Sequence, residues 1–235
     1  MLGIVKSMVH GAGRAYVKRL CSTEFEDQSF LRVNERPVEF SFVFRKLAEI
    51  SPRTVLDVGT GRTALPHLMR TCGFLVTATD NIVDYWPRGL VNRHFHVIND
   101  DITKTEIDQR FDVVTCVSVL EHIEQHDAAI ESMLKLLDPG GHLIVTFPYC
   151  ESKHVENVYD FEDSSYGQDA PYKTRAYCRA DLQRWFPSES GSIVEQEYWR
   201  YWDGEYWTVG NQILPPEKST AQGSHQHTCL HVQKR

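Results

Sequence analysis

The chain has 235 residues, of which 41% are hydrophobic and 24% charged, and its net charge is −7. This length supports one domain with a sizeable core, and the composition excludes wholesale disorder and a collagen-like or coiled-coil rod. No stretch approaches the roughly 20 apolar residues that span a bilayer. Because affinity for nucleic acid depends on neutralising phosphates, the acidic balance predicts no nucleic-acid partner.

The six cysteines form no C-x-x-C pair, and the histidines show no zinc spacing. Several cysteines lie in apolar strand-like runs, where free Cys behaves as a small core hydrophobe. With no secretory signal evident, a disulfide framework is not expected. We therefore predict a reducing, cytoplasmic location and no metal site, and the sequence does not indicate an oligomeric state.

Residues 1–20 carry Lys6, Arg14, Lys18 and Arg19 and no acid, with apolar residues near helical spacing. One interpretation is a basic amphipathic helix in peripheral contact with an anionic membrane. The other is a helix that packs on the domain or covers its active site. Two glycines in this stretch weaken an independent helix and favour the second interpretation, so we predict an N-terminal helical cap over residues 1–36.

From residue 37 to residue 147, strand-like and helical patterns alternate. This alternation predicts parallel βαβ units in an open, doubly wound α/β sheet. The predicted strands are 54–58, 74–79, 94–98, 111–117 and 142–147. The predicted helices are 37–50, 63–72 (with Pro66 in its first turn), a short helix near 103–108, and 122–137, with a short helix or loop at 81–90.

The character of the sequence changes after residue 148. Residues 150–177 are polar and irregular, too long for an ordinary connection, and a helix is predicted at 179–186. Asp203-Gly204 lies within an aromatic stretch and predicts a tight hairpin turn. We expect an exposed loop at 211–226 and a closing strand at 227–233, so that 148–235 holds an insertion and the C-terminal strands.

The most informative segment is VLDVGTGRTA, residues 55–64. Gly59 and Gly61 directly follow a strand and allow a ligand to approach the backbone closely, while the next helix offers free N–H groups. Asp80 ends the second strand, where an acid can accept hydrogen bonds from two ribose hydroxyls. Together these residues predict a nucleoside-containing cofactor at the carboxyl ends of the strands.

Two cofactors fit this pattern. Gly59-x-Gly61-x-x-Ala64 formally satisfies a dinucleotide fingerprint, which would indicate NAD. However, Asp57 precedes the first glycine by two residues, and its carboxylate would repel a pyrophosphate. The same carboxylate could accept hydrogen bonds from the cationic amino-acid part of S-adenosylmethionine, which carries no phosphate.

The sequence resembles the class I S-adenosylmethionine-dependent methyltransferases over roughly residues 37–147. The segments that carry this resemblance occur in the family's order: VLDVGTG, Asp80, Asp100-Asp101-Ile102, FDVVTCVSVLEHI (111–123) and LLDPGGHLIVTF (136–147). The resemblance implies a single domain with a three-layer Rossmann-like methyltransferase fold. Its mostly parallel sheet would have seven strands, the last of them antiparallel, and residues 37–147 would form the cofactor-binding core.

The resemblance also implies roles for individual residues. Gly59 and Gly61 would give S-adenosylmethionine close backbone approach, and Asp57 would support its methionine end. Asp80, with Asn81 beside it, would contact the ribose, and Ser118 would lie near the methionine end. Asp101 would accept from the adenine amino group, and Ile102 would pack on the adenine ring.

The sequence departs from the family's patterns at two places. Thr63 stands where the first motif has a third glycine, which suggests a slightly different turn. Some metal-using relatives carry Glu-x-x-Glu-His after the fourth strand, whereas this chain has Ser118-x-x-Glu121-His122 and lacks the first ligand. We therefore interpret Glu121-His122 as a helix start rather than a metal site. Asp101 could equally cap the short helix that follows it.

Candidates for the chemistry at the acceptor lie after the fifth strand, at the edge of the sheet where ligands bind. His154 is the first choice for a general base, with Asp160 and Tyr149 beside it in the sequence. An aromatic set could form the acceptor surface, although strand packing would also explain part of it. Its members are Tyr149, Tyr159, Tyr166, Tyr172, Trp199, Trp202, Tyr206 and Trp207.

The predicted function is methyl transfer from S-adenosylmethionine to a small-molecule or glycan acceptor, with oxygen preferred as the acceptor atom. The alternatives are N-methylation of a small metabolite, an NAD-dependent oxidoreductase, and an adenosyl-binding protein without catalysis. The product of the cofactor would be S-adenosylhomocysteine.

Overall fold

A computed structural model of the chain describes residues 2–26, 34–83, 85–86 and 89–235. The chain forms two compact units, Met1–Glu35 and Arg36–Arg235. The first unit contains one long helix, α1 (Leu2–Glu26). Among the residues that the structure describes, no helix has the length and apolar character needed to cross a membrane.

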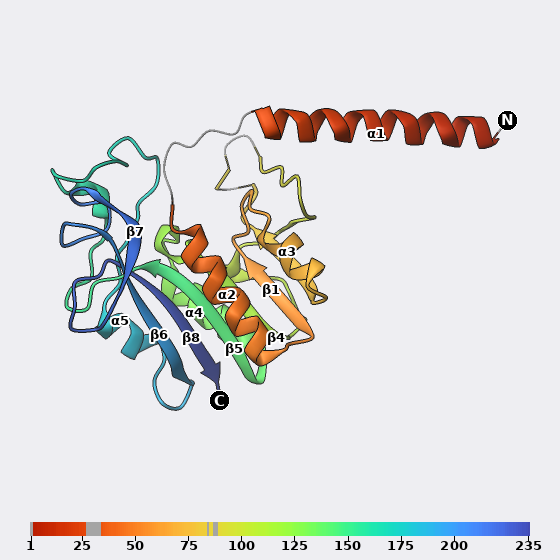
Figure 1. Cartoon of the computed structure of the whole chain (residues 1–235). Coiled ribbons are helices and arrows are strands. Elements are labelled where there is room, and N and C mark those ends of the chain that lie inside the picture. Colours follow the sequence, from red (N-terminus) through yellow and green to blue (C-terminus); the bar gives the residue numbers. More distant parts are fainter. Residues whose placement is uncertain (1, 27–33, 84, 87–88) are drawn as a thin grey trace. The chain divides into compact units, whose positions relative to one another are not determined.

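The second unit is built on a sheet that contains eight strands within the described residues, in the order β3-β2-β1-β4-β5-β8-β6-β7 (Figure 1). The strands are β1 (Thr54–Val58), β2 (Leu75–Asp80), β3 (Ile98–Asn99), β4 (Phe111–Val117), β5 (Leu137–Pro148), β6 (Gly191–Trp202), β7 (Gln212–Ser219) and β8 (His227–Lys234). The pairs among β1 to β5 are parallel, and β8 lies antiparallel between β5 and β6. The predicted Rossmann-like fold with an antiparallel last strand is confirmed.

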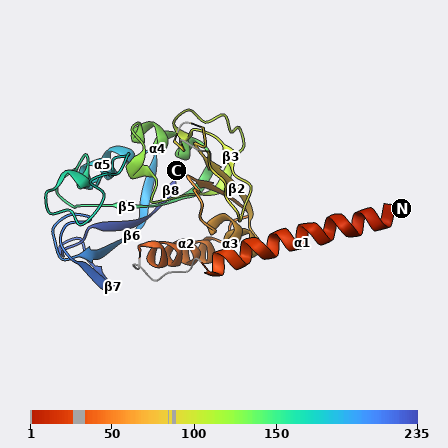
Figure 2. The ribbon, with the colours of Figure 1, turned by 90° about the horizontal axis from the view of Figure 1, so that it is seen from above.

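Helices cover both faces of this sheet (Figure 2). Helices α2 (Arg36–Ile50) and α3 (Leu65–Thr71) lie on one face, and α4 (His126–Lys135) and α5 (Arg179–Trp185) lie on the other. Successive residues of β1 pack on opposite faces of the sheet. Val55 packs with the α2 and α3 side chains, whereas Leu56 packs with those of α4 and α5. Because side chains alternate across a strand, short runs of apolar residues supply both cores.

The sheet has one strand more than the seven predicted. The expected exposed loop at 211–226 contains β7, which pairs antiparallel with β6. The hairpin predicted at Asp203-Gly204 is present, because β6 pairs antiparallel with β7, but the loop that joins the two strands begins at Asp203 and is longer than a two-residue turn. Three of the loop's residues, Trp207, Thr208 and Val209, are buried, so the connection is held open by side-chain burial beyond a two-residue turn.

Two further predictions in the first half need correction. The strand predicted at 94–98 is reduced to Ile98–Asn99, since the side chain of Asn92 accepts from the backbone N–H groups of His94 and Phe95 and forms a turn. The helix predicted at 122–137 is shorter, because a 3₁₀ turn at Leu120–His122 precedes α4. A second 3₁₀ turn, Ile102–Lys104, replaces the short helix near 103–108.

The segment after β5 is irregular, as the sequence predicts, and contains a 3₁₀ turn at Val158–Asp160. A separate core holds it to the C-terminal strands through Val155, Val158 and Ala176, which pack with aromatic residues of the 201–207 region. The side chain of Arg175 is buried and donates to Glu124 Oε2 at 2.7 Å and Glu156 Oε1 at 2.8 Å. These contacts fix the insertion beside the carboxyl ends of the parallel strands.

Candidate functional site

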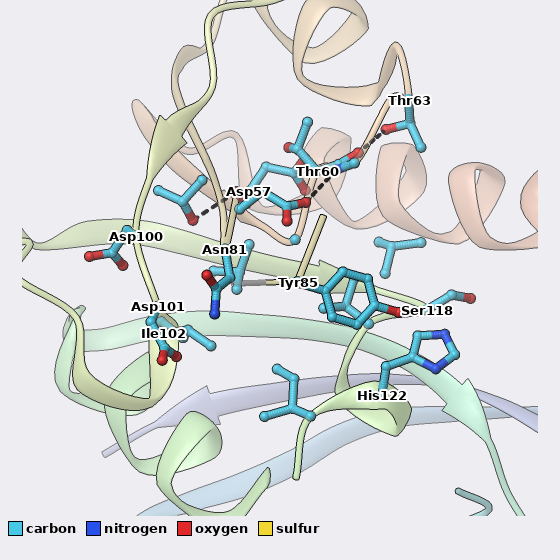
Figure 3. A pocket seen from close by; sticks show the side chains of 18 of the residues that line it. Asp57, Thr60, Thr63, Asn81, Tyr85, Asp100, Asp101, Ile102, Ser118 and His122 are labelled. Carbon is cyan, nitrogen blue, oxygen red and sulfur yellow. Dashed lines mark hydrogen bonds between the residues drawn. The ribbon is translucent and has the colours of Figure 1, made fainter. Parts of the chain in front are cut away.

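A cavity of about 770 Å³ opens at the carboxyl ends of β1, β2 and β4 (Figure 3). This edge is where open parallel sheets bind ligands, since the loops there diverge to neighbouring helices. All eight residues predicted to bind the cofactor line it: Asp57, Gly59, Gly61, Asp80, Asn81, Asp101, Ile102 and Ser118. In Figure 3, Asp100, Asp101 and Ile102 lie at one end and Ser118 and His122 at the other.

The turn after β1 depends on its two glycines. Gly59 has φ +72° and Gly61 has φ +57°, in the left-handed region that side chains disfavour. A Cβ atom on Gly59 would lie 2.4 Å from Val119 Cγ1, which is a clash. The N–H groups of Gly59 and Thr60 both donate to the carbonyl of Thr79, at 2.8 and 3.1 Å. These contacts keep the backbone of the turn close against the ends of β2 and β4.

Asp57 is the most buried carboxylate of the cavity, with 2% exposed surface. Its Oδ1 accepts from Thr115 Oγ1 at 2.7 Å, and its Oδ2 accepts from Thr60 Oγ1. Burial raises the pKa of Asp57 to about 6, although both hydroxyl groups lower it. A cationic group in the cavity would favour the charged form of this carboxylate.

Asp80 ends β2 and accepts from two neighbours. The N–H of Gly61 donates to Oδ2 at 2.7 Å, and the indole Nε1 of Trp86 donates to Oδ1 at 2.8 Å. Burial raises the pKa of Asp80 against these hydrogen bonds. The Arg62 guanidinium lies 5.6 Å from the Trp86 ring centroid. The sequence does not predict a contact between Trp86 and Asp80, because it indicates only a short helix or loop at 81–90.

Three residues after β3 form the other end of the cavity. Asp101 Oδ1 accepts from Thr103 N at 3.0 Å and Thr103 Oγ1 at 2.8 Å, so Asp101 caps the 3₁₀ turn as the alternative interpretation expected. The neighbouring Asp100 also lines the cavity, and its Oδ1 accepts from Glu106 N at 3.0 Å. Its Oδ2 is buried and has no hydrogen-bond partner among the described residues. Ile102 is buried beside them.

Ser118 follows β4 and has φ +49°. Its Oγ donates to Glu39 Oε1 at 2.6 Å, and Arg36 Nη1 donates to Glu39 Oε2 at 2.8 Å. Burial alone would raise the pKa of Glu39, but the His227 hydrogen bond and the Arg36 charge bring it down to about 2. The buried Glu39 carboxylate therefore positions two cavity residues, Arg36 and Ser118, from different elements.

His122 lines the cavity with Tyr85 and Tyr172. Its Nδ1 lies 2.8 Å from the carbonyl oxygen of Lys173. Because a carbonyl oxygen only accepts, Nδ1 carries the proton and Nε2 of the neutral ring is left as an acceptor. Burial lowers the pKa of His122, so the ring is neutral at pH 7. The Tyr172 ring packs edge-on at 4.7 Å between centroids.

The three residues expected to act on the acceptor do not line this cavity. His154 Nδ1 lies 2.9 Å from Asp181 Oδ2, whose hydrogen bond raises the pKa of the imidazole. The hydroxyl of Tyr149 donates to Glu151 Oε2 at 2.9 Å, and the Tyr149 ring is buried. Asp160 Oδ1 accepts from Asn157 Nδ2 at 2.7 Å. The structure thus brings together the cofactor-side residues and separates these three from them.

Of the aromatic set expected at the acceptor surface, Tyr172 lines the cavity. Trp202 and Trp207 are buried in the core of the insertion, as the strand-packing alternative predicted. The cavity instead takes Phe40, Tyr85 and Trp86 from the first half of the chain. His122 was visible in the sequence motif after β4, whereas no sequence signal identified Trp86.

Within the described part of the chain, no group of three or more His, Cys, Asp or Glu side chains is arranged to hold a metal ion. Glu121 Oε1 lies 3.9 Å from His122 Nε2. This distance suits electrostatic stabilisation of a protonated imidazole.

Comparison with known families places residues 34–204 in a methyltransferase domain family. Among curated proteins, the chain is 28% identical over 140 residues to the ubiquinone biosynthesis O-methyltransferase of Serratia proteamaculans, covering 55% of this chain and 56% of that protein. It is 30% identical over 116 residues to the mitochondrial enzyme of that name from Schizosaccharomyces pombe, and this match covers 44% of this chain and 41% of that protein. The chain thus spans about half the length of these relatives.

Solved structures share the fold at low sequence identity. A putative methyltransferase from Bacillus halodurans matches with a TM-score of 0.58 and 13% identity, over 83% of this chain and 98% of that one. The N-methyltransferase NodS from Bradyrhizobium japonicum, solved with S-adenosylhomocysteine, matches with a TM-score of 0.51 and 16% identity, over 85% and 87%. The Synechocystis magnesium protoporphyrin IX methyltransferase, also solved with S-adenosylhomocysteine, matches with a TM-score of 0.54 and 17% identity. The match covers 88% of this chain and 90% of that one.

Proposed function

Because the chain belongs to the class I S-adenosylmethionine-dependent methyltransferases, we propose that it methylates a hydroxyl group of a small-molecule or glycan acceptor, with His122 as general base. The observation that carries the choice of oxygen is the neutral His122 ring, whose Nε2 is an acceptor and which lines the cavity. A hydroxyl must lose its proton when it gains a methyl group, so a base adjoining the cavity suits this acceptor.

The residues of the cavity fit the cofactor of this family. The Gly59 turn leaves no room for a side chain, and the buried Asp57 carboxylate suits a cationic ligand better than a pyrophosphate. Asp80 offers a carboxylate to ribose hydroxyls, and the buried Asp100 Oδ2 can accept from an adenine amino group. We assign the methionine carboxylate to Arg36, whose guanidinium lines the cavity near Ser118.

When bound, S-adenosylmethionine supplies a methyl group on a positively charged sulfur. An acceptor oxygen that took this methyl group would give up its proton, and His122 Nε2 would receive it. Glu121 Oε1, at 3.9 Å, stabilises the imidazolium that results. The protein contributes orientation and proton transfer rather than a covalent intermediate.

The names of the relatives support oxygen as the acceptor atom. The Serratia and Schizosaccharomyces proteins are O-methyltransferases of ubiquinone biosynthesis, although the match covers about half of each. Tyr85 and Tyr172, each 40% exposed, add aromatic surface beside His122. Aromatic faces bind planar rings and sugars alike, so this surface supports either acceptor class.

The test is a screen of hydroxyl and amine compounds with isotope-labelled S-adenosylmethionine, followed by variants on the best acceptor. We expect label in hydroxyl compounds, and His122→Asn should lower kcat by about 10²- to 10⁴-fold while S-adenosylhomocysteine affinity is retained. His67→Asn, at an exposed position on α3, is the matched control. Label found only in amines would exclude O-methylation but leave methyl transfer intact.

The same screen separates the two histidine assignments. If His154→Asn abolishes turnover and His122→Asn does not, the base lies in the insertion, as the sequence alone suggested. If S-adenosylhomocysteine binds but no acceptor is ever labelled, the chain is an adenosyl-binding protein without catalysis.

A further inference from the structure

The composition of the long helix α1 is unlike that of the rest of the chain. It runs without interruption through Gly11 and Gly13, although glycine disfavours the interior of a helix. Residues 1–23 contain four of the 25 Lys and Arg residues and none of the 32 Asp and Glu residues. A basic N-terminal segment is therefore joined to a strongly acidic remainder.

Three of the four Lys and Arg residues of α1 form a row with a histidine. Lys6, His10, Arg14 and Lys18 follow one another at four-residue steps, which places them on one side of a helix. The opposite side is apolar as far as Tyr16, and Arg19 follows on that side. It carries Val5, Met8, Val9, Ala12 and Tyr16, at the three- and four-residue spacing that defines a helical face.

The apolar side chains of this face are large and exposed. Val5, Met8, Val9 and Tyr16 are 57%, 69%, 64% and 66% exposed. The first unit contains no other helix or strand among its described residues that could cover them. An apolar face on the side opposite a row of positive charges suits a helix that lies in the plane of a membrane surface.

We propose that α1 binds the surface of membranes that contain anionic lipids, with its apolar face inserted among the headgroups and its basic row against their charges. Charge complementarity selects this occupant, because juxtamembrane Lys and Arg residues are attracted to anionic lipid. A second copy of the same helix, paired through the apolar faces, would leave both basic rows on the outside without a neutralising partner. This proposal does not depend on the identity of the methyl acceptor.

The experiment measures co-sedimentation of the full chain with vesicles of phosphatidylcholine alone and of phosphatidylcholine mixed with phosphatidylglycerol. We expect binding to the mixed vesicles, little binding to the neutral ones, and weakening at high salt. The variant Lys6→Gln/Arg14→Gln/Lys18→Gln should lower affinity for the mixed vesicles about 100-fold, from about a fivefold loss at each position. A control with Arg70→Gln, Arg110→Gln and Lys135→Gln, all exposed on the second unit, should bind like the parent.

A second variant tests the apolar face, with Val5→Ser, Met8→Ser and Val9→Ser. We expect it to lose vesicle binding while keeping its melting temperature. Equal binding to both vesicle types, or equal losses in the control, would overturn the proposal. So would absence of binding combined with a lower melting temperature in the serine variant, because α1 would then be packing on protein. Dimerisation through α1 without vesicle binding would overturn it in favour of a second copy.

Discussion

The indole Nε1 of Trp86 donates to Oδ1 of Asp80, the carboxylate that we assign to the cofactor ribose. The other oxygen, Oδ2, already accepts from the Gly61 N–H. Each carboxylate oxygen can accept a further hydrogen bond, so a ribose hydroxyl bound at Oδ1 would lie directly beside the Trp86 indole. Trp86 should thus report cofactor binding directly.

We expect S-adenosylhomocysteine to change the intrinsic tryptophan fluorescence of the protein, and Trp86→Phe to remove most of that change. Asp80→Asn should weaken binding at least tenfold, since a hydrogen bond to a charged group contributes about 1.5–3 kcal/mol. Trp199→Phe, a tryptophan outside the cavity lining, serves as the control. An unchanged signal in the Trp86 variant would show that this indole does not move.

The two acids after β3 should differ in their importance for binding. Asp100 Oδ2 is buried without a partner among the described residues, whereas Asp101 is engaged as a helix cap. Calorimetric titration with S-adenosylhomocysteine should show a larger loss for Asp100→Asn than for Asp101→Asn. In thermal unfolding, Asp101→Ala should lose about 1 kcal/mol, the typical cost of a lost cap, whereas Asp101→Asn should keep the cap. The opposite order of affinities would indicate that Asp101, rather than Asp100, binds the adenine amino group.

Gly59→Ala should abolish cofactor binding. The added Cβ would sit 2.4 Å from Val119 Cγ1, and the residue must hold φ +72°. The matched control is Gly73→Ala, which imposes similar strain at φ +103° but meets nothing within 4 Å. We expect the control to lose roughly 1–2 kcal/mol of stability and retain binding. Binding by the Gly59 variant at parental affinity would contradict the close-approach role.

The pH dependence of turnover follows from the His122 base. Burial lowers the pKa of this imidazole below its ordinary 6.5, so the neutral form persists through pH 7. The value of kcat/KM should fall only in acid, as pH drops through the lowered pKa. His122→Asn should flatten this limb of the profile. A limb with a midpoint above 6.5 would instead point to a group whose pKa is raised, as that of His154 is.

Glu39 should make stability depend on pH in acid. Its pKa is about 2 in the folded protein against an ordinary 4.5, so its stabilising contribution is complete above about 4.5 and is lost as pH falls toward 2. Urea unfolding at pH 6 and pH 3.5 should show a smaller difference for Glu39→Gln than for the parent. Glu131→Gln, exposed on α4, should behave like the parent. If the free energy of unfolding changed equally between the two pH values in all three proteins, Glu39 would not be a source of the pH dependence.

The cofactor side of the site could be read from the sequence because it is encoded locally. Asp57, Gly59 and Gly61 lie within five residues at one strand end, and a strand–turn–helix places them without reference to distant parts of the chain. Asp80 follows from the next strand, since parallel strands bring their carboxyl ends to one edge. The regular alternation of strands and helices predicted the α/β class, whereas the antiparallel closing strand was implied by the resemblance to the methyltransferase family.

The acceptor side was decided by tertiary structure. His122 becomes a base candidate only when the insertion returns and places the Lys173 carbonyl 2.8 Å from Nδ1, a contact across 51 positions. Trp86 reaches Asp80 from a segment without periodicity, while His154 is drawn to Asp181 on α5. Local pattern fixes strands and their glycine turns, whereas irregular segments take their positions from side-chain burial and long-range hydrogen bonds that no spacing encodes.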